Sequence, residues 1–347
     1  MEKSFTPYER VRKAVELKEP DRVPVFPSVV AHAAKIYGIS YKAFCTDSDN
    51  LAYASINNSE KYNFDGIFIQ ADGWTEAEAI GVELIYLEDN SPSGRAPIIN
   101  SKSDLKKLGI PDPYKAGRMP IVIRANEIVV RENKNYRFIK SQIDQSPFAL
   151  ACELMGFNKV FYNIYDDPIF LHEVLDFCTR VQIEYGKAII RTGIHSVFLG
   201  ESIGSQVSSK VYSEFLLPYN SEVIKTMKSE GVYATLHTCG NSTHNLELMA
   251  KTGADIIEFD SAVDIKWAKN TVGDKVCLQG NINTTDLLFK TPEYIEELCK
   301  DCILKAAPGG GYILSPGCEP APNTPHDNMI AMTNASRKYG TYPIREK

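Results

Sequence analysis

The chain has 347 residues, of which 44% are hydrophobic and 24% are charged, and its formal net charge is -6. This composition is typical of a globular protein, and the acidic balance gives no reason to expect nucleic-acid binding. No apolar run of about 18 residues predicts a membrane span, and the charged N-terminal stretch lacks the apolar segment of a signal peptide. We therefore expect a cytoplasmic protein whose eight cysteines are reduced thiols, core residues or metal ligands.

Short apolar runs alternate with helical patterns along the chain, which predicts a parallel sheet covered by helices. Eight runs are predicted to be strands, at residues 22–29, 65–72, 136–143, 196–202, 232–239, 254–260, 275–282 and 311–318. Eight strand–helix units of this length predict a (β/α)8 TIM barrel. The alternative, a doubly wound open sheet, normally carries a glycine-rich loop after its first strand, and "VPVFPSVVAHAA" has none. We predict one barrel domain over residues 1–347, with a short helical extension at its N-terminus.

Polar side chains follow most of these strands. Seven of the eight end in such residues, namely Asp72, Gln142 and Asp144, Glu201, His237 and Cys239, Glu258 and Asp260, Gln279 and Asn281, and Cys318 and Glu319. In this kind of barrel the active site lies at the C-terminal ends of the strands. From this set we predict catalytic roles for Glu258, Asp72 and Glu201, and cofactor-binding roles for Gln279 and Asn281.

The stretch "HTC" places His237 and Cys239 two residues apart on a predicted strand. Side chains at this spacing point to the same face, and an imidazole with a thiolate makes half of a tetrahedral zinc site. Cys318, at the end of the last predicted strand, is the natural third ligand. Three protein ligands leave one position open, as in catalytic zinc sites. The alternative is that His237 is a hydrogen-bonded core histidine and Cys239 a buried thiol.

A second cysteine pair, Cys299 and Cys302 in "CKDC", lies within a predicted amphipathic helix that follows Thr291. Residues three apart on a helix share a face, and on an amphipathic helix that face normally packs into the core. We therefore expect both cysteines to be core residues.

Longer motifs surround the proposed ligands: "HTCGN", "GADIIEFD", "LQGNINTTDLL" and "ILSPGCEPAPNTPHDNM". With these motifs the chain resembles the uroporphyrinogen decarboxylase superfamily over nearly its full length. Within the superfamily it looks most like the zinc-dependent corrinoid methyltransferases of the methylcobamide:coenzyme M type. The resemblance implies a (β/α)8 barrel and His237, Cys239 and Cys318 as zinc ligands. It also implies methylcobalamin as a cofactor carried by a partner corrinoid protein, since the chain has no D-x-H-x-x-G pattern to present a histidine to cobalt.

The resemblance implies methyl transfer between a corrinoid and a thiol such as coenzyme M, with zinc stabilising the thiolate. Transfer from a methyl ether or methylamine to Co(I) remains an alternative, because zinc can also act as a Lewis acid on the methyl donor. The soft His/Cys/Cys ligand set favours the thiol. Decarboxylation of uroporphyrinogen is less favoured, because the stretch "VFPSVVAHAAKIYG" lacks the arginines that a polycarboxylate substrate would need. Glu258 is a candidate for the fourth zinc position or for a carboxylate lining the barrel.

Overall fold

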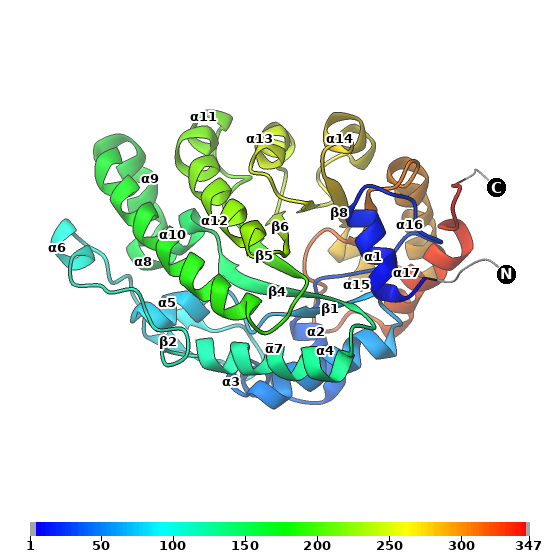
Figure 1. Cartoon of the computed structure of the whole chain (residues 1–347), viewed down its shortest axis with the longest axis horizontal. Coiled ribbons are helices and arrows are strands. Elements are labelled where there is room, and N and C mark those ends of the chain that lie inside the picture. Colours follow the sequence, from blue (N-terminus) through cyan, green and yellow to red (C-terminus); the bar gives the residue numbers. More distant parts are fainter. Residues whose placement is uncertain (1–4, 345–347) are drawn as a thin grey trace.

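A curled sheet of seven parallel strands lies inside a layer of helices in the computed structural model, which describes residues 5–344 (Figure 1). The strands follow one another in the order β1-β4-β5-β6-β7-β8-β9. Their bounds are β1 (Gly66–Ile69), β4 (Phe138–Gln145), β5 (Ser196–Gly200), β6 (Tyr233–Thr238), β7 (Ile256–Phe259), β8 (Cys277–Ile282) and β9 (Tyr312–Pro316). Each overlaps a predicted strand. A separate antiparallel pair is formed by β2 (Leu84–Ile85) and β3 (Ser93–Gly94).

The eighth predicted strand, residues 22–29, closes the sheet without forming a regular strand. Val25 makes a parallel bridge to Leu314 of β9, and the backbone N–H of Asp65, next to β1, donates to the Val25 carbonyl at 2.8 Å. The prediction of a full strand here is wrong because Pro24 and Pro27 have no N–H to give to a ladder. The segment still lies between β9 and β1, so the expected (β/α)8 barrel is confirmed.

Helices connect the strands and cover the outside of the sheet (Figure 1). They are α1 (Pro7–Val15), α2 (Ala31–Tyr37), α3 (Tyr41–Thr46), α4 (Ser48–Lys61), α5 (Thr75–Ile80), α6 (Lys102–Leu105), α7 (Met119–Asn133), α8 (Pro147–Met155), α9 (Phe157–Asp166), α10 (Pro168–Ile190), α11 (Ser209–Val211), the π-helix η1 (Tyr212–Leu216), α12 (Leu217–Ser229), the 3-10 helix η2 (Thr243–Asn245), α13 (Leu246–Lys251), α14 (Ile265–Val272), α15 (Thr284–Phe289), α16 (Pro292–Ala306) and α17 (His326–Tyr339). No helix in this described part of the chain is long and apolar enough to cross a membrane.

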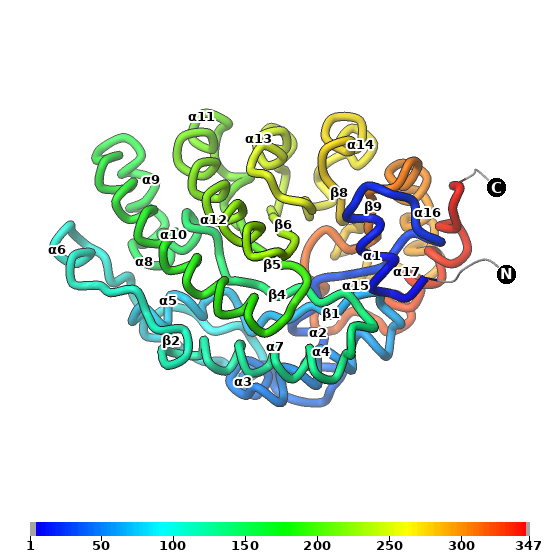
Figure 2. The backbone as a smooth tube through the Cα atoms, viewed as in Figure 1, coloured from blue at the N-terminus to red at the C-terminus, as the bar shows by residue number. Residues whose placement is uncertain are grey.

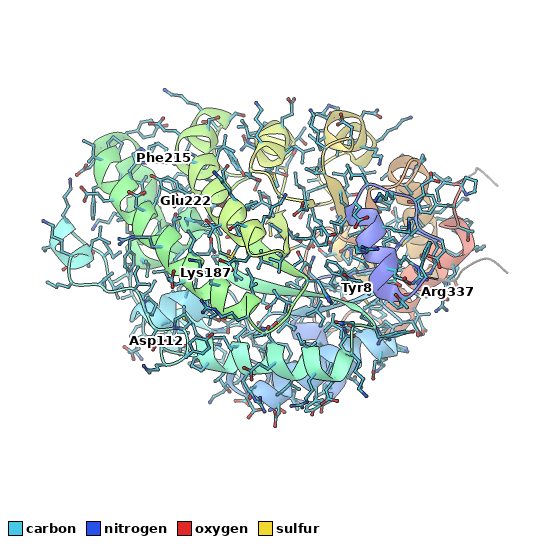
Figure 3. All side chains as sticks on the ribbon, viewed as in Figure 1. Tyr8, Asp112, Lys187, Phe215, Glu222 and Arg337 are labelled. Carbon is cyan, nitrogen blue, oxygen red and sulfur yellow. The ribbon has the colours of Figure 1, made fainter. Side chains whose placement is uncertain are left out.

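The predicted N-terminal extension is α1, which begins at a capping box formed by Thr6 and Glu9. Figure 2 shows α1 and α17 at the end of the molecule where both termini lie. Tyr8 and Arg337 label these two helices in Figure 3, and the Tyr8 ring packs on Phe138 at the start of β4. The ends of the predicted domain, residues 1–4 and 345–347, lie outside the described residues.

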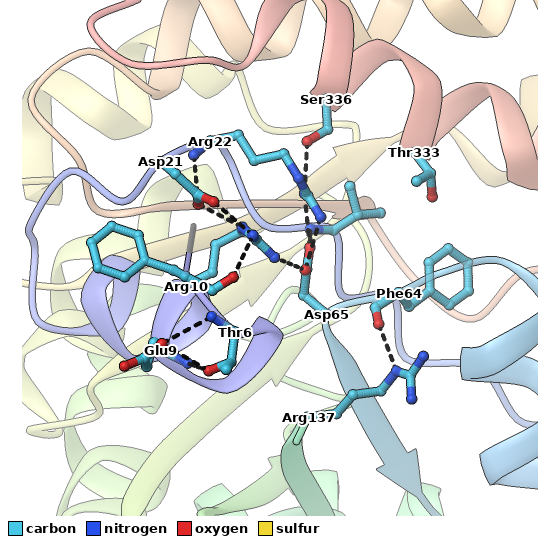
Figure 4. A network of polar contacts seen from close by, with 12 residues as sticks. Thr6, Glu9, Arg10, Asp21, Arg22, Phe64, Asp65, Arg137, Thr333 and Ser336 are labelled. Atoms are coloured by element: carbon cyan, nitrogen blue, oxygen red, sulfur yellow. Dashed lines mark hydrogen bonds and ion pairs between the residues drawn. The ribbon is translucent and has the colours of Figure 1, made fainter. Parts of the chain in front are cut away.

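An ion-pair network ties α1 to the closing segment (Figure 4). Asp65 accepts hydrogen bonds from Arg10 at 2.6 Å and from Arg22 at 2.9 Å, and its second oxygen accepts the Val25 N–H at 2.8 Å. Arg10 also pairs with Asp21 at 2.6 Å. Asp65 is 1% exposed. Charge-assisted hydrogen bonds to a buried carboxylate are strong, so this network holds residues 22–29 against β1 where a regular ladder is missing.

Helices cover one face of the parallel strands and the barrel interior buries the other, so these strands are expected to be apolar. Most are, but β4 carries Lys140, Ser141 and Gln142 at three successive buried positions. Cys299 and Cys302 on α16 are 0% and 8% exposed. This confirms the prediction that both belong to the core.

Candidate metal centre

Three predicted ligands converge where β6 and β9 end. His237 Nε2 lies 3.0 Å from Cys239 Sγ and 3.8 Å from Cys318 Sγ, and the two sulfurs lie 3.4 Å apart. Within the described residues, these three form the single cluster of His, Cys, Asp or Glu side chains with ligand atoms close enough to share a metal ion. His237 is 7% exposed, while both cysteines are partly exposed. The cluster is therefore open to solvent on its sulfur side.

Local backbone structure explains how Cys239 and Cys318, which are 79 positions apart in the sequence, come into contact. His237 lies on β6 and Cys239 follows directly after that strand. Cys318 follows β9 through Gly317, whose N–H donates to the Ile282 carbonyl at 2.8 Å. A Cβ on Gly317 would lie 2.6 Å from the backbone nitrogen of Ser261. Glycine at position 317 thus allows the loop to pass close to the end of β7, and this brings Cys318 to the cluster.

The ligand atoms have roughly the spacing that zinc requires. Tetrahedral zinc with ordinary Zn–S and Zn–N bonds separates neighbouring ligand atoms by about 3.6 to 3.8 Å. The distances of 3.4 and 3.8 Å to Cys318 are close to this, and the His237–Cys239 distance of 3.0 Å would lengthen. A hydrogen bond from Cys318 lowers the pKa of Cys239, while the same contact raises the pKa of Cys318. Cys239 is therefore the sulfur of the pair that ionises more easily.

A carboxylate lies on the other side of the imidazole ring. Register places His237 of β6 opposite Glu258 of β7, and Glu258 opposite Gln279 of β8. Glu258 Oε1 is 3.5 Å from His237 Nδ1, a buried atom that makes no hydrogen bond within the described residues. Cross-strand neighbours on one face are packed side by side, so this carboxylate is fixed next to the ring.

Lys140 of β4 lies beneath Glu258. Its ammonium is 3.0 Å from Glu258 Oε2 and 3.1 Å from Gln279 Oε1. The phenyl rings of Phe26, Phe68 and Phe198 surround it, with centroids 4.9, 5.4 and 5.1 Å from Nζ. Lys140 is 0% exposed, and burial lowers its pKa while Glu258 opposes this effect. A buried charge requires such a partner, and Glu258 supplies it.

A cavity of about 170 Å³ opens on the metal ligands. Its lining combines the three candidate ligands with amide, hydroxyl, carboxyl and aromatic groups from the ends of the other strands: Ser28, Gln70, Gln142, Gln145, Phe198, Gly200, Ser202, His237, Cys239, Glu258, Cys318 and Glu319. This volume suits a small molecule. The wall contains hydrogen-bonding groups close to the two sulfurs, so a substrate bound at the metal could be oriented by them.

The other predicted catalytic and cofactor-binding residues do not line this cavity. Asp72 is bound by Arg118, at 2.5 and 3.1 Å, and is 3% exposed. Glu201 is fully buried and accepts a hydrogen bond from Asn220 at 3.0 Å. Asn281 donates to the backbone carbonyls of residues 260 and 263 and lines a different pocket. Gln279 contacts Lys140 and is fully buried. Of the predicted catalytic residues, the structure brings the Glu258 side chain to the metal ligands, and it leaves the side chains of Asp72 and Glu201 outside the cavity lining. The backbone N–H of Glu201 nevertheless donates to the His237 carbonyl at 2.8 Å.

The family model for uroporphyrinogen decarboxylase (URO-D) matches residues 6–339. The chain belongs to the uroporphyrinogen decarboxylase family. This confirms the family resemblance that the sequence motifs indicated.

Relatives in this family carry two kinds of name. The chain is 27% identical to the methylcobamide:CoM methyltransferase MtbA of Methanosarcina acetivorans, over 96% of this chain and 98% of that protein. It is 30% identical to the uroporphyrinogen decarboxylase of Hydrogenovibrio crunogenus, over 93% of this chain and 96% of that protein. A solved methyltransferase structure from Methanosarcina mazei superimposes with a TM-score of 0.88, at 22% identity, over 96% of this chain and 99% of that one. This last similarity shows the shared fold.

Sequence reasoning missed several residues beside the ligands. Lys140 is one of them, and its one signal in the sequence is that a lysine inside the apolar run "YRFIKSQI" is unusual for a buried strand. Gln70 and Gln145 line the cavity, and they lie two residues before Asp72 and directly after Asp144, which are the residues that the strand-end pattern indicates. Ser28, which donates to Glu258 at 2.9 Å, gave no sequence signal because serine is common in loops.

Proposed function

We propose that this protein is a zinc-dependent methyltransferase that moves a methyl group between a corrinoid, carried by a partner protein, and a thiol bound at the metal centre. The observation that carries the proposal is the convergence of His237 Nε2 and the sulfurs of Cys239 and Cys318. Three ligands of this kind leave one zinc position open, as in catalytic sites. The name of the Methanosarcina acetivorans relative supports a corrinoid and a thiol such as coenzyme M.

When bound, zinc would hold the substrate sulfur as a thiolate at neutral pH, which makes it a nucleophile for the methyl group. The chain's own residues would perform the remaining tasks. His237, Cys239 and Cys318 hold the metal, and the Phe198 ring stacks on the His237 ring with centroids 5.5 Å apart. The amides of Gln70, Gln142 and Gln145 lie in the cavity wall, where they can orient the rest of the substrate.

The lining of the cavity argues against uroporphyrinogen decarboxylation. Among the described residues that line it, none is an arginine or a lysine, and Glu258 and Glu319 are both present. A substrate with many carboxylates would find no cation in this wall to bind it. Asp72, one of the predicted catalytic residues, is bound by Arg118. Its predicted catalytic role, and that of Glu201, stay predictions.

Methyl transfer can be tested directly with the purified protein and methylcobalamin. We expect loss of the methylcobalamin absorbance spectrum when coenzyme M or another small thiol is added, and no loss in Cys318→Ser. Cys152→Ser changes a partly exposed cysteine on α8 outside the metal centre and should remain active. Activity with methoxyaromatic donors and Co(I) in place of thiols would shift the assignment to the donor-side alternative. Activity with neither substrate class would contradict the proposal.

A further inference from the structure

A buried lysine inside a barrel requires an explanation. Lys140 is completely enclosed, and three phenylalanine rings surround its ammonium. An apolar side chain would fill such a position without the desolvation penalty of a charge. The charge is therefore expected to contribute something besides packing.

The contacts of Lys140 lead to the metal centre in two steps. Its ammonium binds Glu258 Oε2 at 3.0 Å, and Ser28 donates to the same oxygen at 2.9 Å. With Oε2 held by two donors, the other oxygen, Oε1, is directed toward His237 Nδ1 at 3.5 Å. The opposite ring nitrogen, Nε2, faces Cys239 Sγ at 3.0 Å. The two steps thus follow one line of side chains from β4 through β7 to β6.

The orientation of the His237 ring determines what Glu258 must do. If Nε2 binds a metal, it must be unprotonated, so the proton of the neutral ring lies on Nδ1. That Nδ1 atom is buried and makes no hydrogen bond within the described residues. Metal-binding histidines normally donate this proton to a carboxylate or carbonyl group, which fixes the tautomer and the ring angle. Glu258 Oε1 is in place to accept it after a shift of a few tenths of an ångström.

We infer that Lys140 is a positioning residue of the metal centre: it holds Glu258 so that the carboxylate orients His237 for metal binding. The inference rests on the proposed function, since it assumes that His237 binds zinc. Gln279 completes the arrangement, because its carbonyl oxygen accepts from Lys140 at 3.1 Å while its amide donates to the Phe26 carbonyl at 2.8 Å. Lys140 is thereby fixed on the side facing Glu258 and is not free to move to another partner.

A double-mutant cycle on zinc affinity tests this inference. Wild type, Lys140→Met, Glu258→Gln and the double variant would be titrated with zinc against a chromogenic chelator. Substituting a residue that is hydrogen-bonded to a metal ligand typically lowers metal affinity by about 10- to 100-fold. Each single variant should therefore weaken zinc binding by about 10-fold or more. If Lys140 acts through Glu258, the double variant should bind zinc no more weakly than Glu258→Gln alone. Effects that multiply, or an unchanged affinity in Lys140→Met, would overturn the inference.

Controls separate metal binding from folding. Lys187→Met removes a lysine that is paired with Glu184 on the outer helix α10 (Figure 3), and it should leave zinc affinity unchanged. Thermal unfolding in excess chelator reports the stability of each metal-free variant. If Lys140→Met does not fold, Lys140→Gln takes its place in the cycle, because its amide is uncharged and its side chain is one bond too short to hold Glu258 as the ammonium does. Weaker zinc binding by Lys140→Gln, with a double variant that binds zinc no more weakly than Glu258→Gln, supports the inference, and an unchanged affinity in Lys140→Gln overturns it.

The same zinc titration distinguishes failure of the proposed function from failure of the inference about Lys140. A wild-type protein that binds no zinc would overturn the proposed function together with this inference. A wild-type protein that binds one zinc, with no coupling between Lys140 and Glu258, would overturn the inference alone. Spectra of the cobalt-substituted proteins provide a second readout, because a misoriented imidazole changes the visible bands of the metal without requiring any catalytic assay.

Discussion

Asp144, at the end of β4, is a buried carboxylic acid with few hydrogen-bond partners. Its backbone has a φ of 71°, a left-handed conformation that aspartate and asparagine tolerate better than most residues. One carboxyl oxygen accepts the Glu76 N–H at 2.6 Å, and the other makes no hydrogen bond within the described residues. Burial, with a smaller contribution from Asp72, raises the pKa of Asp144 to about 7. Below neutral pH, this side chain therefore keeps its proton in the folded state.

We predict that Asp144 makes the protein less stable as pH rises from about 4 to about 7. In this window the unfolded chain has released the proton while the folded chain still binds it. The free energy of unfolding then falls by up to about 1.4 kcal/mol per pH unit from this group, and no further once both states are ionised above pH 7. Asp144→Asn keeps a side-chain oxygen that can accept the Glu76 N–H, and asparagine tolerates the same backbone conformation. The variant cannot ionise, so it removes this group's contribution to the pH dependence of stability.

Urea unfolding at several pH values between 5 and 8 would measure the effect. The difference in unfolding free energy between Asp144→Asn and wild type should change with pH, in favour of the variant as pH rises. The exposed Asp274 provides the matched control, and Asp274→Asn should follow the wild-type curve. Parallel curves for wild type and Asp144→Asn would show that Asp144 is ionised in the folded state throughout this range.

Among the barrel elements, the closing segment at residues 22–29 differs most from a regular strand. The Phe26 ring lies against Gly66 at the start of β1, where a Cβ would be 2.4 Å from the nearest ring atom. Both residues are buried, and the Phe26 ring also packs on the ammonium of Lys140 at 4.9 Å. The close approach of this segment to β1 therefore depends on the missing side chain at Gly66.

Gly66→Ala should lower the free energy of unfolding by about 1 to 3 kcal/mol, because an added methyl group in a packed core forces its neighbours to move. Gly109→Ala is the matched control, since a Cβ at that position would have no atom within 4 Å. Chemical denaturation of the two variants would measure the difference. Equal stabilities would mean that Phe26 moves aside without loss and that closure does not depend on this contact.

The elements also show how far sequence patterns can predict structure. Seven strands were predicted because parallel barrel strands are buried on both faces and appear as short apolar runs. Residues 22–29 had the same apolar character, but ladder formation depends on backbone N–H groups, which the two prolines lack. Asp72 and Glu201 follow strands as expected of site residues, yet their partners Arg118 and Asn220 lie 46 and 19 residues further along the chain. Sequence spacing does not reveal such contacts.

At the scale of the whole molecule, the barrel brings together side chains that are far apart in sequence. The strand-end pattern correctly placed His237, Cys239, Glu258 and Cys318 in one group, because all strands of a parallel barrel end on the same side. It could not identify Lys140 from the middle of β4, because a buried lysine is understood only through its partner on β7. The site thus has a part that follows from topology and a part that follows from packing inside the barrel.

Zinc content measured by mass spectrometry of the purified protein, together with its cysteine variants, tests the central claim most directly. We predict one zinc per chain in wild type and in Cys152→Ser, and substantial loss of zinc in Cys239→Ser and Cys318→Ser while the fold, followed by circular dichroism, is retained. A wild-type protein without zinc, or cysteine variants that keep it fully, would contradict the assignment of His237, Cys239 and Cys318 as the metal centre.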